Sequence, residues 1–240
     1  MYLTVDSFST HGMAKRINSK KVKNIGKTTK IRLRKLFSPA KLQATLLRYE
    51  SIPVFGKNDL RRLLGLSVKQ TERALSEALA EGVLVRIKPG LFGLSVRLPS
   101  AFALANYLVS PSYISLESAL SYHRIIPETV YAVTSVTPKF PKRFNRLNRD
   151  FAYHRMNRNL FFGYNKISIG GVPILMADKE KAVLDYLYFV VRGLRKVNQR
   201  SDFSKLDKDK LASYLIHFRN ALKGRKRVAY DNLLKTLNIV

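Results

Sequence analysis

The chain has 240 residues, of which 46% are hydrophobic, and a formal net charge of +28. This length allows one large or two small domains with a buried core. Cysteine is absent, which excludes disulfides and thiolate metal sites and fits a reducing compartment. No apolar run approaches the ~20 residues of a membrane-spanning helix, and the N-terminus lacks an apolar signal-peptide core. We therefore expect a cytoplasmic protein without membrane contact.

Positive charge is spread over the whole chain. Residues 1–98 hold 20 basic and 6 acidic side chains, and residues 99–240 hold 24 and 10, so each part has a net charge of +14. A field of this sign attracts nucleic acid or an acidic partner. The alternative is a generally basic composition without a specific partner.

Residues 1–36 are predicted to form a flexible basic arm. Between Ala14 and Lys35 there are ten Lys or Arg residues and no acidic residue. Such a block repels itself and has too little apolar surface to fold alone. We expect it to add non-specific phosphate contacts, although a start codon placed too early is a competing explanation.

Residues 37–98 have the pattern of a winged helix-turn-helix domain. Apolar residues recur at helical spacing over 39–48 and 57–64, and Gly65 ends the second helix. A capping box at Ser67 and Gln70 then starts a third helix at Val68, which Gly82 ends. Two wing strands follow, Val83 to Lys88 and Leu91 to Leu94, joined by a type II turn at Pro89-Gly90. The predicted buried stripe of the third helix consists of Val68, Thr71, Leu75, Ala78 and Leu79.

Basic and amide side chains lie on the opposite face of this third helix. Lys, Gln and Arg are the residue types that pair with guanine or adenine in the major groove. The residues predicted to bind double-stranded DNA are Lys57, Arg61, Lys69, Gln70, Arg73, Arg86 and Lys88. The alternative is a protein-interaction module whose exposed cations are only solvated.

Residues 99–240 are predicted to form a second, mixed domain, which gives an α+β fold for the chain. Helices are expected at 101–108, after Ser115, after Asp178, at 208–222 and at 227–237. Strands are expected at 130–137, 151–156 and 160–164, and in a hairpin with a Gly170-Gly171 turn.

A basic loop spans residues 139–149 of this domain. Its cations, which are candidates for contacts with phosphate or a tRNA-like molecule, are Lys139, Lys142, Arg143, Arg146 and Arg149. The neighbouring aromatic residues could stack on bases of single-stranded RNA, but their strand spacing favours the core. These aromatic residues are Tyr153, Phe161, Phe162 and Tyr164.

The residues give little support to an enzyme. Catalysis on nucleic acid normally needs clustered carboxylates for metal ions, and here they are scattered. Glu180 and Asp185 fall on different helix faces, so we interpret Glu180 as a helix-dipole partner and Asp185 as an internal hydrogen-bonding group. His123 follows a helix end and is expected to be packed or hydrogen-bonded there. We predict no catalytic residue, no metal site and no cofactor.

The second domain resembles the AbiEi family in an ordered series of short motifs. These are the segments Tyr113 to His123, Ile126 to Glu128, Val133 to Thr137, Phe161 to Tyr164 and Glu180 to Asp185. The resemblance spans about residues 40–235. It departs from the family in the basic arm and in Arg124, where relatives often have Gly.

The resemblance implies a transcriptional regulator and antitoxin of a bacterial abortive-infection, type IV toxin–antitoxin system. The N-terminal domain would bind inverted repeats in its own promoter, and the C-terminal domain would counter a nucleotidyltransferase toxin. Its basic surface would meet that toxin or the toxin's RNA substrate. The alternatives are an RNA-binding protein that grips structured RNA with the winged helix and arm, and an enzyme whose site the sequence does not reveal.

Overall fold

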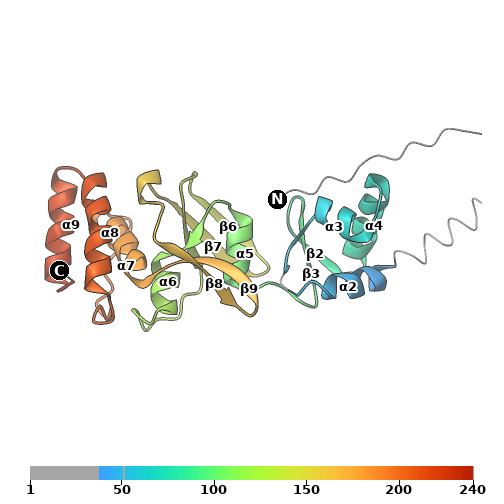
Figure 1. Cartoon of the computed structure of the whole chain (residues 1–240), viewed down its shortest axis with the longest axis horizontal. Helices are drawn as coiled ribbons and strands as arrows, with labels where there is room; N and C mark the ends of the chain where they lie inside the picture. The colour runs from blue at the N-terminus through green and yellow to red at the C-terminus, as the bar shows by residue number, and fades with distance from the viewer. Residues whose placement is uncertain (1–37, 51, 240) are drawn as a thin grey trace, which may run out of the picture.

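The computed structural model describes residues 38–50 and 52–239, so the basic arm predicted for residues 1–36 lies outside the described residues. The fold is of the α+β class, as predicted. Helices and strands of the N-terminal part lie at one end of the elongated molecule and α7 to α9 at the other, with the larger sheet between them (Figure 1).

The helices span Pro39–Leu47 (α2), Lys57–Leu64 (α3), Val68–Ala80 (α4), Ala101–Leu108 (α5), Leu116–Tyr122 (α6), Lys179–Val191 (α7), Lys208–Ala221 (α8) and Arg225–Thr236 (α9), with a 3-10 turn at Arg158–Leu160 (η1). The strands span Phe55–Gly56 (β1), Leu84–Lys88 (β2), Leu91–Leu94 (β3), Tyr113–Ile114 (β4), Val133–Thr137 (β5), Lys142–Arg146 (β6), Arg149–Arg155 (β7), Tyr164–Ile169 (β8) and Val172–Ala177 (β9). None of the helices in the described part of the chain is both long and apolar enough to cross a membrane.

The N-terminal part has a core of its own beneath α2, α3 and α4. A three-stranded antiparallel sheet in the order β1-β3-β2 closes this core. Arg97, just after β3, donates to the carbonyl groups of Leu46, Leu47 and Tyr49 at the end of α2, at 3.0 to 3.1 Å. These bonds tie the segment after β3 to the backbone at the end of α2.

A bulge in β2 directs neighbouring side chains of this small sheet into two different cores. Arg86 pairs with Phe92, but Lys88 pairs with Leu91, so Ile87 is an extra residue. Phe92 lies in the N-terminal core, whereas Ile87 belongs to the larger core of the C-terminal part. The β2–β3 hairpin is therefore shared between the two cores.

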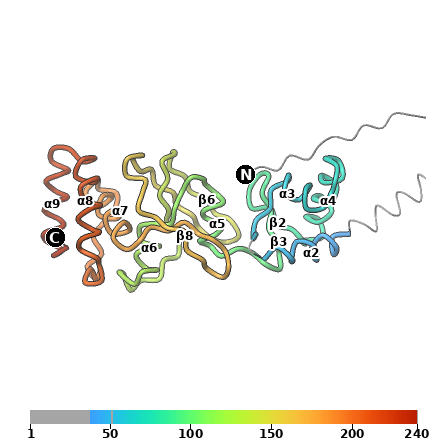
Figure 2. Tube along the Cα trace, viewed as in Figure 1, coloured from blue at the N-terminus to red at the C-terminus, as the bar shows by residue number. Residues whose placement is uncertain are grey.

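The larger sheet has the strand order β6-β7-β5-β4-β9-β8 and is mixed. Neighbouring residues of β7 point to opposite faces. The Tyr153 hydroxyl donates to the Ala105 carbonyl in α5, and His154 packs edge-on against Phe189 in α7. Hence α5 covers one face and α7 the other, and α8 and α9 lie beyond α7, as the trace also shows (Figure 2).

Three sequence predictions in the second domain are wrong. The basic segment 139–149 is not a loop, because residues 142–146 form β6, the edge strand beside β7. The strand predicted over 160–164 is a 3-10 turn followed by irregular backbone, in which Gly163 has a φ of +68° and lies against the Lys181 side chain. A Cβ atom there would come within 3.0 Å of the lysine stem. The strand predicted over residues 130–137 begins three residues later, at Val133.

Candidate nucleic-acid interface

The turn between α3 and α4 is fixed by two local devices, both as predicted. Gly65 ends α3 in the left-handed conformation at a φ of +61°, which glycine adopts without steric cost. The Ser67 hydroxyl accepts from the Gln70 amide at 3.4 Å, and the Gln70 side chain accepts from the Ser67 amide at 2.9 Å. This capping box sets where α4 starts and which side chains it presents.

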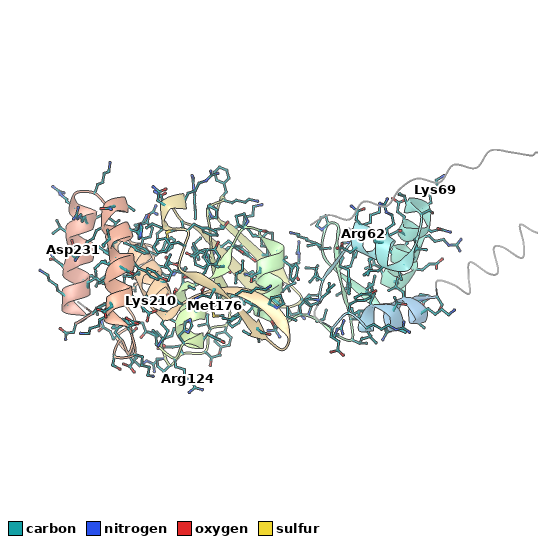
Figure 3. All side chains as sticks on the ribbon, viewed as in Figure 1. Arg62, Lys69, Arg124, Met176, Lys210 and Asp231 are labelled. Carbon is teal, nitrogen blue, oxygen red and sulfur yellow. The ribbon has the colours of Figure 1, made fainter. Side chains whose placement is uncertain are left out.

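The first two residues of α4, Val68 and Lys69, are exposed. Lys69, the second residue of α4, lies at the edge of the N-terminal part in this view (Figure 3). Val68, predicted to be buried, is 50% exposed because it precedes the buried stripe of Thr71, Ala74, Leu75 and Ala78. The prediction that Val68 belongs to the buried stripe is therefore wrong.

Two of the predicted DNA-binding cations form exposed ion pairs. Lys57 lies 2.6 Å from Glu72, which lowers the pKa of that carboxyl, and Arg73 lies 2.8 Å from Glu77. Exposed pairs of this kind contribute only about 0–1 kcal/mol, so a phosphate or base can replace the carboxylate. Within the described residues, Arg61 and Lys69 have no carboxylate partner.

The sequence predicts that Lys88 extends from the β2–β3 hairpin toward DNA, but the structure turns it toward α5. Strict alternation would put it on the same face as Arg86, but the bulge at Ile87 turns it to the other face. Its ammonium group donates to the carbonyl oxygens of Tyr107 and Leu108 at 2.8 and 3.0 Å. Burial, and then the nearby Lys139 and Lys142, lower the pKa of Lys88. Arg86 remains exposed on the β2–β3 hairpin.

We expect Lys88 to support stability rather than DNA binding. Lys88→Met keeps the apolar stem but removes the two hydrogen bonds to the end of α5, which should cost about 1–3 kcal/mol of unfolding free energy. Affinity for DNA should change less than twofold. Urea unfolding and fluorescence anisotropy on the same preparation measure both quantities, and an unchanged unfolding midpoint with weakened DNA binding would contradict this assignment.

The second predicted surface lies on the edge strand β6 and its flanks. Its five cations are all exposed: Lys139, Lys142, Arg143, Arg146 and Arg149. Charged residues on an edge strand also prevent unwanted strand pairing. Next to this strand, burial and the cations Arg195 and Arg143 lower the pKa of His154 to about 4. Burial is the larger cause of this shift, and the two nearby cations add to it.

The motifs that carry the family resemblance meet in a buried network. The Asp185 carboxylate accepts from the Tyr113 hydroxyl at 3.0 Å and from the Ser115 hydroxyl at 2.8 Å, and it pairs with Lys181. All four side chains are buried, and the loss of hydration lowers the pKa of Lys181 and raises the pKa of Asp185. The Asp185 prediction is therefore confirmed. Ser115 uses its hydroxyl here and does not cap α6, and Leu116 starts that helix at a φ of +57°.

The aromatic residues near this network serve mainly as packing. Tyr153 is fully buried, and Phe161, Phe162 and Tyr164 are half-buried around Tyr113 and Lys181. His123 ends α6 and its Nε2 lies 2.8 Å from the Ala177 carbonyl oxygen, so its predicted hydrogen-bonded position is confirmed. Within the described residues, no three His, Asp or Glu side chains gather in a way that could hold a metal ion.

Comparison of the chain with protein-family models gives no match, and comparison with curated proteins gives none either.

Proposed function

We propose that the protein is a sequence-specific, DNA-binding autorepressor and the antitoxin of a type IV toxin–antitoxin system. The N-terminal part would be a winged helix-turn-helix domain, with α4 in the major groove and the β2–β3 hairpin as the wing. The observation that carries the DNA half of the proposal is the capped N-terminal half of α4, which presents Val68, Lys69 and Arg73 to solvent.

These side chains match what a major groove offers. Lys and Arg donate to guanine, and a valine methyl group can contact thymine. The Arg61 side chain on α3 and the Arg86 side chain on the hairpin are exposed and can contact flanking phosphates. Lys88, held by α5, is left out of the proposed contacts.

The antitoxin half of the proposal is supported by the resemblance. Its motifs around Tyr113 and Lys181 are more than sixty residues apart in the sequence, yet they form one buried network. Residues in such a network determine the fold of the domain, so a shared series of motifs favours a shared fold. Function would then lie on the surface, where the cations of β6 are exposed.

Binding to promoter DNA tests the first half. The full-length protein should bind a fragment that contains the inverted repeat upstream of its own gene about 10³-fold or more tightly than a scrambled fragment, at one fixed salt concentration. Gel retardation with both fragments measures the ratio. Equal affinity for the two fragments would contradict a sequence-specific regulator.

Co-expression with the nucleotidyltransferase toxin that the resemblance implies, which we expect to be encoded beside this protein, tests the second half. Wild-type protein should restore growth, and charge reversal at Lys142, Arg143 and Arg146 should reduce this protection if the basic surface is involved. Charge reversal at Lys166, which is exposed on the opposite edge strand β8, is the matched control. Full protection by the β6 variant would remove this surface from the mechanism, and no protection by wild-type protein would refute the antitoxin assignment.

A further inference from the structure

A basic groove borders one end of β6. It has a volume of about 940 Å³ and runs between the start of that strand, the segment after β7 and the end of α7. Aromatic and amide side chains also line it. Its cations are Lys139, Lys142, Arg155, Arg158 and Arg192.

These five cations are not neutralised. No carboxylate lines the groove, and in residues 38–50 and 52–239 none of the five forms an ion pair. Elsewhere in the C-terminal part, cations such as Arg195, Arg200 and Arg219 are paired with Glu or Asp. The groove therefore concentrates uncompensated positive charge in one concave place, which favours a polyanionic ligand.

Neutral contacts hold two of these cations in position. The Lys139 ammonium donates to the Ser110 carbonyl oxygen at 2.5 Å, and the Arg192 guanidinium donates to the Tyr188 hydroxyl at 3.0 Å. Such contacts fix the side chains without cancelling their charge. Lys139 and Lys142 are also close enough to Lys88 to lower its pKa, so the positive region continues to the β2–β3 hairpin.

An exposed aromatic side chain lies among the cations. Phe140 is 73% exposed, and the Arg155 guanidinium lies 5.4 Å from its ring centre. A phenylalanine ring can stack on a base only where the base is unpaired, because bases within a duplex cover each other's faces. Cations along a groove and an exposed ring together are the features that bind single-stranded nucleic acid without regard to sequence.

We propose that this groove, here called the β6 groove, binds a short single-stranded nucleic acid segment. Its phosphates would lie along Lys142, Arg158 and Arg192, and one base would stack on Phe140. The site is separate from the proposed DNA-binding face of α4. A variant can therefore lose binding in the β6 groove and still bind operator DNA, or the reverse.

Fluorescence anisotropy of the full-length protein with a labelled ten-nucleotide oligouridylate tests the proposal. Lys142→Glu combined with Arg158→Glu should weaken binding about tenfold or more and reduce the slope of log affinity against log salt by about 1.4, since each lost contact with a single strand removes about 0.7. The control Lys166→Glu with Lys235→Glu changes the net charge equally at exposed positions of β8 and α9, and should weaken binding less than threefold. Equal losses in both double variants would refute a localised site.

Phe140→Ala separates stacking from charge. It should weaken oligouridylate binding about five- to tenfold, within the range of base–aromatic stacking, and leave the affinity for a twelve-base-pair duplex unchanged. Photocrosslinking with a 4-thiouridine-containing oligonucleotide should label residues 138–158. Crosslinks only to residues 1–37, equal losses for duplex and single strand, or tighter binding of polyglutamate than of oligouridylate would each overturn the proposal. We expect Phe140→Ala, and Lys142→Glu with Arg158→Glu, to bind the inverted-repeat fragment as tightly as the wild type does. This result would show that the α4 face and the β6 groove bind independently.

Discussion

Replacement of Asp185 by Ala should lower the free energy of unfolding by about 3–5 kcal/mol. Asp185 is completely buried and is the carboxylate partner of Lys181, whose ammonium group is also completely buried. Without the carboxylate, the lysine retains the Tyr113 hydroxyl and the aromatic rings of Phe162 and Phe218 around it, which do not balance its charge. The Tyr113 and Ser115 hydroxyls also lose their acceptor.

Removal of both charges should cost less than removal of one. In the double variant Lys181→Met with Asp185→Leu, no buried charge remains, and apolar groups fill most of the same space. We expect at least half of the stability lost in Asp185→Ala to return. Urea unfolding of the wild type, Lys181→Met, Asp185→Leu and the double variant gives the coupling between the two positions, and Asp185→Ala is measured beside them. A double variant less stable than Asp185→Ala would show that packing, and not the unpaired charge, dominates.

Replacement of Lys69 and Arg73 by Ala should weaken operator binding by about 1–3 kcal/mol for each residue that contacts a base edge. Both side chains are exposed near the start of α4, and the Glu77 pairing of Arg73 is weak enough to be exchanged for a base. The loss for scrambled DNA should be much smaller, so that the specificity ratio falls.

A charge-matched variant in α2 controls for the loss of two cations. Lys41→Ala with Arg48→Ala removes the same charge from exposed positions outside the proposed contact face. It should reduce the affinities for operator and scrambled DNA by the same small factor. If the α4 variant behaves in the same way, Lys69 and Arg73 contact phosphates and base recognition lies elsewhere.

Elements fixed by hydrogen bonds between near neighbours could be predicted from the sequence. The capping box at Ser67, the glycine end of α3 and the Gly170-Gly171 hairpin all form within a few residues, and the structure confirms each of them. Both glycines of that hairpin have positive φ, which the two-residue turn requires. The Asp178 cap of α7 is confirmed for the same reason.

Elements that depend on distant partners could not be predicted. The two-residue strands β1 and β4 exist only because β3 and β5 lie beside them. The strand β6 has a charged sequence typical of a loop, and only its pairing with β7 makes it a strand. In the candidate interface, the bulge at Ile87 moved Lys88 away from solvent, and no pattern in the sequence marks an extra residue in β2.

The shared β2–β3 hairpin has a mechanical consequence. Ile87 and Leu91 contribute to the larger core, while Leu84 and Phe92 contribute to the N-terminal one, so the hairpin cannot shift without disturbing both. Lys88 ties it to the last carbonyl groups of α5. If the hairpin is the wing of the proposed DNA-binding domain, force applied to it by a bent DNA duplex would be carried into α5 and the sheet beneath it. A polypeptide cut after residue 98 would break this connection and uncover apolar side chains in both pieces.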